Sequence, residues 1–252
     1  MKGKFRMHRP CRTWKRWLAG LGISLFAFAS QAAGLSVNPV GVTLEDPQQI
    51  RHLQLRNTGS EPMVLQASVK ELSIADNREQ YADTNALVVT PPVFTIEPGE
   101  EQVVRLGLQD PAPSTEERAF RVFLQQSPKN PATDDSDGNE PTLVQMNLRV
   151  GIPVFVRPSE PVARALIWQM EPTDDGHIRV VAENQGNTHS RISNLSLLDG
   201  KGEVLTESDR LTYLLPGSRR IWTLQIPTGI GQPQHLRFQN QCGSVGVALS
   251  PG

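Results

Sequence analysis

Apolar and polar residues alternate with a period of two over much of the chain after residue 33. Alternation of this kind is typical of β-strands that bury one face and expose the other. Turn sequences such as Asn57-Thr58-Gly59 and Pro98-Gly99 separate the alternating stretches, which do not keep the 3.6-residue period of an amphipathic helix. In the first half of the chain the pattern predicts strands over residues 35–44, 51–57, 63–72 and 102–108.

The second half of the chain repeats the order of strands and turns of the first half. A Pro-Gly turn leads into an alternating strand in both halves, at Pro98-Gly99 and again at Pro216-Gly217. Between the halves, Pro158 and Pro161 block continuous strand pairing. The sequence therefore predicts a domain boundary after residue 157.

Length and composition agree with this organisation. The chain has 252 residues, of which 20 are glycine and 20 are proline, so many turns separate short strands and an all-helical fold is disfavoured. Without an N-terminal targeting segment about 220 residues remain, which suits two sandwiches of roughly 110 residues each. We therefore predict an all-β fold of two tandem immunoglobulin-like β-sandwich domains, over residues 33–157 and 158–252.

The N-terminus has the composition of a secretory signal peptide. Residues 1–16 contain seven Lys and Arg and no acidic residue, and an apolar run of 12 residues follows, too short to span a bilayer. Ser30 and Ala32 fit the cleavage site, and a second register ends at Ala29. We predict a cleaved signal over residues 1–32, periplasmic localisation and no further membrane span; the alternative is an uncleaved membrane anchor.

Removal of the signal changes the charge and the cysteine count. It leaves 18 Lys and Arg against 26 Asp and Glu, a net charge of about −8, which makes nucleic acid an improbable partner. Cys11 is lost with the signal, so Cys242 remains alone and no internal disulfide can form in the oxidising compartment. The stability of the mature chain must therefore come from packing.

No arrangement of residues in the sequence supports catalysis. The chain lacks a Gly-x-Ser-x-Gly nucleophile elbow, a glycine-rich phosphate loop and a His-Glu-x-x-His zinc motif. The histidines are isolated, and Asp134, Asp135 and Asp137 lack the spaced glutamate of a calcium loop. Cys242 has no identifiable base and is expected to be a partly buried structural thiol. We expect a protein that is not an enzyme and uses no metal or cofactor.

Residues 143–153 carry an apolar row along one face of a predicted strand, and an acidic, proline-containing loop over residues 127–142 precedes them. The opposite face is polar, with Gln145, Asn147 and Arg149. Two interpretations are open: a half-buried strand of the protein's own sandwich, or an edge strand whose apolar row is offered to another protein. The row consists of Val144, Met146, Leu148, Val150 and Ile152.

Three motifs follow one another along the first half. They are residues 91–99 (PPVFTIEPG) with 103–106 (VVRL), residues 117–124 (ERAFRVFL) and residues 154–158 (VFVRP). Together they resemble the periplasmic pilus-assembly chaperones of the chaperone-usher pathway, whose two immunoglobulin-like domains are set at an angle. The resemblance is weaker in the second domain, where it depends on the strand pattern and residues 240–243 (NQCG).

The resemblance implies donor-strand complementation, in which a chaperone lends a strand to a subunit that lacks its last strand. It implies that the partners are pilus subunits and an outer-membrane usher that receives the subunit from the chaperone. In this sequence the residues that match the donor strand are Val144, Met146, Leu148 and Val150. The adaptable thioether of Met146 suits a strand that must fit several different grooves.

The sequence departs from the best-known members of this family at the residues that hold the subunit's terminal carboxylate. Those members use an Arg in the first strand and a Lys in the last, whereas the matching positions here are Gly41 and Pro153, which have no side-chain donor. This departure resembles the divergent branch called archaic. The candidate replacements are Arg121 and, with weaker support, Arg149 or Arg105. For Arg121, a surface or intramolecular ion pair is an equally open interpretation.

Further residues match the family at the domain junction. Glu117 and Arg157 match residues that join the two domains by a charge pair, and Gln241 replaces a third acid. We therefore predict a periplasmic chaperone that binds, folds and caps pilus subunits. One alternative is a two-domain immunoglobulin-like periplasmic or surface binding module that recognises a carbohydrate or a protein with its loops, which the presence of only two tyrosines disfavours. A structural pilus subunit is disfavoured by the missing disulfide.

Overall fold

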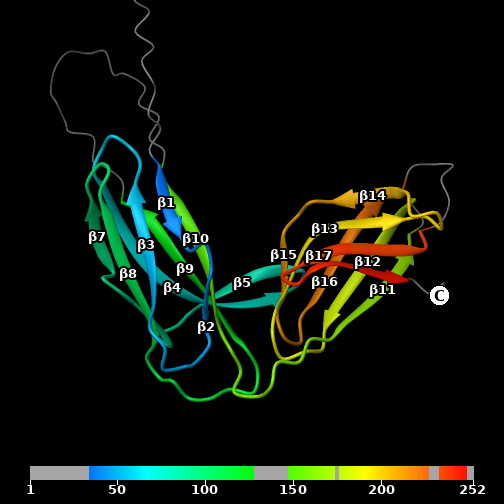
Figure 1. Cartoon of the computed structure of the whole chain (residues 1–252), viewed down its shortest axis with the longest axis horizontal. Coiled ribbons are helices and arrows are strands. Elements are labelled where there is room, and N and C mark those ends of the chain that lie inside the picture. Colours follow the sequence, from blue (N-terminus) through cyan, green and yellow to red (C-terminus); the bar gives the residue numbers. More distant parts are fainter. Residues whose placement is uncertain (1–33, 128–146, 174–175, 227–232, 249–252) are drawn as a thin grey trace, which may run out of the picture. The chain divides into compact units, whose positions relative to one another are not determined.

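The computed structural model describes residues 34–127, 147–173, 176–226 and 233–248, and the regular secondary structure in these ranges is all β-strand (Figure 1). The predicted signal over residues 1–32 lies outside them. Within the described ranges there is no helix long and apolar enough to cross a membrane. The strands form four sheets, two from each half of the chain. The prediction of an all-β fold of two immunoglobulin-like sandwiches is confirmed.

The first half of the chain contributes a four-stranded and a six-stranded sheet. In the four-stranded sheet the order is β1 (Leu35–Asn38), β3 (Arg51–Asn57), β8 (Glu101–Leu108) and β6 (Leu87–Thr90). In the six-stranded sheet the order is β2 (Val42–Leu44), β10 (Arg149–Val156), β9 (Arg118–Gln126), β4 (Met63–Ala75) and β5 (Arg78–Asp83), and β7 (Val93–Ile96) also pairs with β4.

The core of the first sandwich follows from the alternation in the sequence. On β3, Leu53 and Leu55 are fully buried, whereas His52 and Gln54 between and beside them are exposed. Phe120 on β9 fills the same core from the facing sheet. Because this packing fixes the backbone of β9, it also fixes the neighbouring strand β10 on which the candidate site depends.

The second half contributes a three-stranded and a five-stranded sheet around a separate core that includes Trp222 and Phe238. The order of the smaller sheet is β11 (Leu166–Pro172), β12 (His177–Asn184) and β16 (Arg219–Gln225). The larger sheet has the order β14 (Val204–Ser208), β13 (Ser190–Leu198), β17 (His235–Asn240) and β18 (Gly243–Ala248), and β15 (Thr212–Leu214) also pairs with β13. The predicted boundary after residue 157 falls in the connection between β10 and β11.

The single strand predicted over residues 35–44 is instead two strands in different sheets. β1 pairs with β3 in the four-stranded sheet, and β2 pairs in parallel with β10 in the six-stranded sheet. Pro39, which lacks a backbone N–H, lies between them and cannot continue a ladder. The chain passes from one sheet to the other between β1 and β2. This places β2 beside one end of β10, where it covers part of the edge of that strand.

Each sandwich contains a buried asparagine that closes a turn in the same way. The amide of Asn57 donates to the carbonyls of Glu61 and Ile96 at 2.7 and 2.9 Å, and its oxygen accepts from the N–H of Gly59 at 2.9 Å. In the second sandwich Asn184 makes the three equivalent hydrogen bonds, to Thr188, Leu214 and Gly186. Both side chains are completely buried, so these hydrogen bonds replace water for several backbone groups at once.

Candidate functional site

Part of strand β10 has an unpaired edge. On one side β10 pairs with β9 along its whole length. On the other side β2 pairs only with the last three residues of β10, from Val154 to Val156. Among the described residues no strand pairs with residues 149–153 on that side. This stretch is therefore open to a further strand.

The direction of the backbone groups on this edge follows from one hydrogen bond. The N–H of Gln126 on β9 donates to the carbonyl of Leu148 at 2.9 Å, so the backbone groups of Leu148 face β9. Because the direction alternates along an antiparallel ladder, the N–H groups of Arg149 and Gly151 face the open side. Pro153, the next residue with this orientation, has no N–H. The open edge thus offers backbone donors at Arg149 and Gly151 and none at Pro153.

The apolar row of β10 continues from the protein's own core toward the open end of the strand. Ile152 is only 1% exposed and belongs to the core of the first sandwich. Leu148 and Val150 are half-buried and pack against the border of the same core. Val144 and Met146, the other two predicted donor residues, lie outside the described residues, as does the acidic segment from residue 128 to residue 142.

The opposite face of β9 and β10 carries aromatic and cationic side chains packed around a glycine. Gly151 lies opposite Phe123, and a Cβ at position 151 would come within 3.1 Å of the Phe123 ring and 3.3 Å of Arg121 Cδ. The guanidinium carbon of Arg149 lies 4.2 Å from the centre of the Phe123 ring. The ring of Tyr81 meets Phe123 edge-on, with centres 5.2 Å apart. A larger residue at position 151 would displace this cluster.

Arg121 is occupied by a carboxylate of its own chain. It is nine-tenths buried, and its Nη2 donates to Oε2 of Glu79 on β5 at 2.6 Å. The hydroxyl of Tyr81 donates to the same oxygen. Burial raises the pKa of Glu79, but the Tyr81 hydroxyl and the Arg121 guanidinium lower it, so the pKa lies below its ordinary value of 4.5. Arg121 thus forms the intramolecular ion pair that the sequence analysis left open.

The tip of the β4–β5 hairpin is attached to the second sandwich. The amide of Asn77 donates to the carbonyl of Ile221 on β16 at 2.8 Å, and its oxygen accepts from the N–H of the same residue at 2.9 Å. The guanidinium of Arg220 also donates to the backbone carbonyl of Asn77. The side chain of Asn77 therefore pairs with the edge of β16 as a short strand would. This attachment holds β5, and with it Glu79, in place.

Gly41 and Pro153, the two residues that match the family's anchor positions in the sequence, lie against each other. A Cβ on Gly41 would lie 3.4 Å from Cγ of Pro153. Both residues line a cavity of about 350 Å³, whose wall also includes His189, Tyr213 and Arg191. The guanidinium of Arg191 has no ion pair within the described part of the chain. Arg191 was not among the predicted site residues, because nothing in the pattern of β13 distinguishes it from other exposed strand residues.

The two predicted junction residues have different partners. Oε1 of Glu117, the residue before β9, lies 2.6 Å from Nδ1 of His189 and accepts from the N–H of His189 at 2.9 Å. The His189 ring stacks on Phe155 of β10, with centres 3.7 Å apart. Arg157 forms an ion pair with Glu45, near the end of β2. Glu117 thus contacts the second sandwich, whereas Arg157 contacts the first, and a direct Glu117–Arg157 pair stays a prediction.

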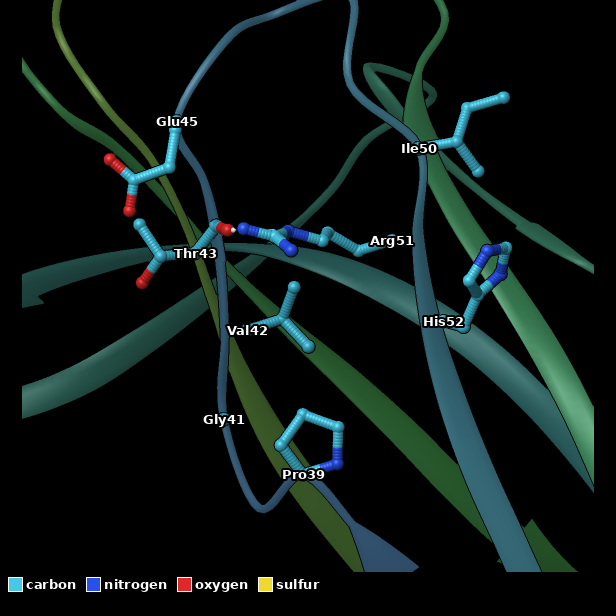
Figure 2. A pocket seen from close by; sticks show the side chains of 8 residues that line it. All are labelled: Pro39, Gly41, Val42, Thr43, Glu45, Ile50, Arg51 and His52. Atoms are coloured by element: carbon cyan, nitrogen blue, oxygen red, sulfur yellow. Dashed lines mark hydrogen bonds between the residues drawn. The ribbon is translucent and has the colours of Figure 1, made fainter.

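The outer edge of β2 is covered by a side chain. A cavity of about 410 Å³ separates β2 from β3, and Figure 2 shows Arg51 crossing it from β3 toward Thr43. Nε of Arg51 donates to the carbonyl of Thr43 at 3.2 Å. A charged side chain on an edge carbonyl prevents another strand from pairing there. Of the two neighbouring edges, β2 is therefore protected and residues 149–153 of β10 are open.

Cys242 differs from the expectation drawn from the sequence. It was expected to be partly buried, but it is an exposed free cysteine. Its N–H donates to Oδ1 of Asn240 at 2.7 Å, in the turn between β17 and β18. The turn, and not the apolar pattern of the strands, decides the exposure of this residue.

Solved structures of pilus chaperone systems resemble this fold, and no curated protein matches the chain. A chain of the CsuC–CsuE chaperone–tip adhesion subunit complex from the archaic Csu pili of Acinetobacter baumannii has a TM-score of 0.64 at 17% identity, over 86% of this chain and 98% of its own. A chain of the Salmonella enterica complex of SafA pilin with the SafB chaperone has a TM-score of 0.61 at 18% identity, over 88% and 99%. The Pseudomonas aeruginosa CupB2 chaperone has a TM-score of 0.57 at 17% identity, over 85% and 100%.

The sequence itself identifies the family to which the chain belongs. Residues 34–161, just over half of the chain, match the model of the family described as pili and flagellar-assembly chaperones, PapD N-terminal domain. This range contains all ten strands of the first sandwich and its open edge. The chain belongs to the family of pili and flagellar-assembly chaperones.

Proposed function

We propose that this protein is a periplasmic chaperone of the chaperone-usher pathway, which binds, folds and caps pilus subunits by donor-strand complementation and delivers them to an outer-membrane usher. Family membership supports this proposal. Two structures with a similar fold are complexes of a chaperone with a tip adhesion subunit and with a pilin. The observation that carries the proposal is the open edge of β10 at residues 149–153.

An open edge beside an apolar row gives both affinity and adaptability. Backbone pairing along residues 149–153 accepts any sequence, while Val144, Met146, Leu148 and Val150 enter the groove left by the subunit's missing strand. Burying one such side chain is worth about 1.5–3 kcal/mol, so three or four of them supply roughly 5–10 kcal/mol before the costs of association. This range supports a tight complex that an incoming strand can still displace.

Because Gly41 and Pro153 occupy the family's two anchor positions and carry no charge, the subunit's terminal carboxylate is held by cations elsewhere on the chaperone. Arg121 is the favoured residue, because its guanidinium already binds a carboxylate in the free protein. Arg191 is a second cation on the cavity that Gly41 and Pro153 line. Arg149 is the weaker candidate, because its guanidinium lies over the Phe123 ring.

Amide hydrogen exchange tests the open edge directly. In a complex with a pilus subunit co-expressed from the source organism, the N–H groups of Arg149 and Gly151 will exchange at least about tenfold more slowly than in the free protein, because the added strand accepts their hydrogen bonds. NMR-detected exchange on both forms is the measurement. The N–H of Val104, a buried residue of β8 paired with Leu53 of β3, is the control and will not change. Unchanged exchange at Gly151 in a stable complex contradicts strand addition.

Substitution of Arg121 tests the carboxylate anchor. Arg121→Gln will weaken subunit binding by roughly ten- to a hundredfold, since a hydrogen bond to a charged group is worth about 1.5–3 kcal/mol. Titration of purified variants with one subunit measures the change. Arg149→Gln removes the same charge from the neighbouring strand and will reduce affinity less than about threefold. Equal losses in the two variants would contradict a specific anchor at Arg121.

A further inference from the structure

Arg121 already holds one carboxylate, and the contact is incomplete. Nη2 donates to a single oxygen of Glu79, and Nε, which is buried, has no hydrogen-bond partner among the described residues. A guanidinium can donate to both oxygens of a carboxylate in a parallel pair. Glu79 thus neutralises Arg121 without using all of its donors.

A buried guanidinium needs a counter-charge when no partner is bound. Arg121 is nine-tenths buried, and Tyr213 lies on another side of it, with 5.9 Å between the guanidinium carbon and the ring centre. Without Glu79 the free protein would contain a buried cation with no compensation, which is strongly unfavourable. Glu79 therefore stabilises the free form of the chaperone.

Glu79 lies where an incoming group can reach it. Its side chain is 27% exposed, and it comes from β5, the last strand of its sheet. The Tyr81 hydroxyl holds the carboxylate on the Arg121 side, and the attachment of Asn77 to β16 holds the strand. Glu79 can leave Arg121 by a change of its own side-chain torsions, without unfolding of the hairpin.

We propose that Glu79 is an internal competitor for the carboxylate site at Arg121, and that a subunit's terminal carboxylate displaces it on binding. This inference rests on the proposed function. The exchange replaces a contact with one carboxylate oxygen by a paired contact with two, so the chaperone gains the difference between these contacts and not the full value of the new one. Affinity at the anchor is thereby reduced, which keeps the subunit releasable to its next partner.

Removal of the Glu79 charge tests the competition. The probe is a short peptide of alternating valine and threonine, labelled with fluorescein at its N-terminus and prepared with either a free carboxylate or an amide at its C-terminus. Binding by fluorescence anisotropy gives the ratio of acid to amide affinity for each variant. In Glu79→Gln this ratio will rise about tenfold above wild type, because the internal carboxylate no longer competes.

Two further variants separate competition from structural damage. Asp83→Asn removes the same charge from the same hairpin, at an exposed residue paired with Lys70, and will leave the ratio unchanged. Tyr81→Phe keeps Glu79 but removes the hydroxyl that holds it, and will raise the ratio by a smaller factor than Glu79→Gln. If Glu79→Gln fails to fold, the result for Tyr81→Phe decides the question.

The outcomes distinguish this inference from the function on which it rests. A wild-type preference for the acid peptide that Arg121→Gln abolishes, together with a higher ratio in Glu79→Gln, supports both. The same wild-type preference with an unchanged ratio in Glu79→Gln and Tyr81→Phe overturns the competition and leaves the anchor intact. Equal affinity for acid and amide peptides in both the wild type and Glu79→Gln overturns the anchor at Arg121, and the competition with it, whereas equal affinity in the wild type with a preference for the acid in Glu79→Gln supports the competition.

Discussion

Leu148→Glu is expected to abolish capture of a pilus subunit and to leave the chaperone folded. Leu148 lies at the border of the core and is only half-buried, so in the free protein a glutamate at this position can turn its carboxylate to water. In the complex the same carboxylate would enter an apolar groove without a partner, at a cost of several kcal/mol. Binding will fall by more than about a hundredfold. Co-expression with a subunit and affinity purification measure the loss, and thermal unfolding reports the fold.

A matched variant on the other face of the strand controls for charge. Asn147→Asp adds a carboxylate one residue away at an exposed position, and subunit capture will persist. Met146→Asp is a second variant on the apolar row, for use if Leu148→Glu unfolds. Undiminished capture by a folded Leu148→Glu protein would remove β10 as the donor strand.

Asn184→Ala is expected to destabilise the second sandwich by about 3 kcal/mol. The substitution removes three hydrogen bonds and leaves the carbonyls of Thr188 and Leu214 and the N–H of Gly186 buried without this partner. Each unsatisfied buried group costs roughly 1–3 kcal/mol, and partial access of water lowers the sum. Urea unfolding followed by tryptophan fluorescence gives the change, because Trp222 belongs to this core.

The first sandwich provides a duplicate of this experiment. Asn57→Ala removes the equivalent three hydrogen bonds and will cost a similar free energy of unfolding. Asn85→Ala, at an exposed position, will change stability by less than about 0.5 kcal/mol. A loss below about 1 kcal/mol at Asn184 would show that water or rearrangement replaces the side-chain amide.

Strands were predictable from the sequence because their side chains alternate, but pairing partners were not. The pattern over residues 51–57 and 102–108 agrees closely with β3 and β8, whose inward residues fill the core. Residues 35–44 also alternate, yet they divide between two sheets, because alternation does not encode which edge a strand joins. The open edge of β10 depends on this division, so the alternation alone left an edge strand as one of two interpretations.

The candidate site was predictable only where one strand carries it. The apolar row of β10 lies within one short segment of the sequence, so the period-two alternation is enough to predict it. The contact between Arg121 and Glu79 joins residues 42 positions apart, and that of Glu117 with His189 joins residues 72 apart. Such pairs depend on the register between strands, which a single sequence does not specify. Arg191 was missed for the same reason, since only the fold brings it to the cavity beside Gly41 and Pro153.

The unpaired edge of β10 ends at Val154, where the pairing with β2 begins. β2 therefore limits how far along β10 an added strand can pair. A slip of one residue would turn each guest side chain to the opposite face of the sheet. Because β2 already pairs with β10 from Val154 onward, a guest strand that runs parallel to β10 must end with its last paired residue near Pro153. If strand addition occurs as proposed, guests that differ in sequence are aligned from the same end, so that different subunits bind β10 in one register.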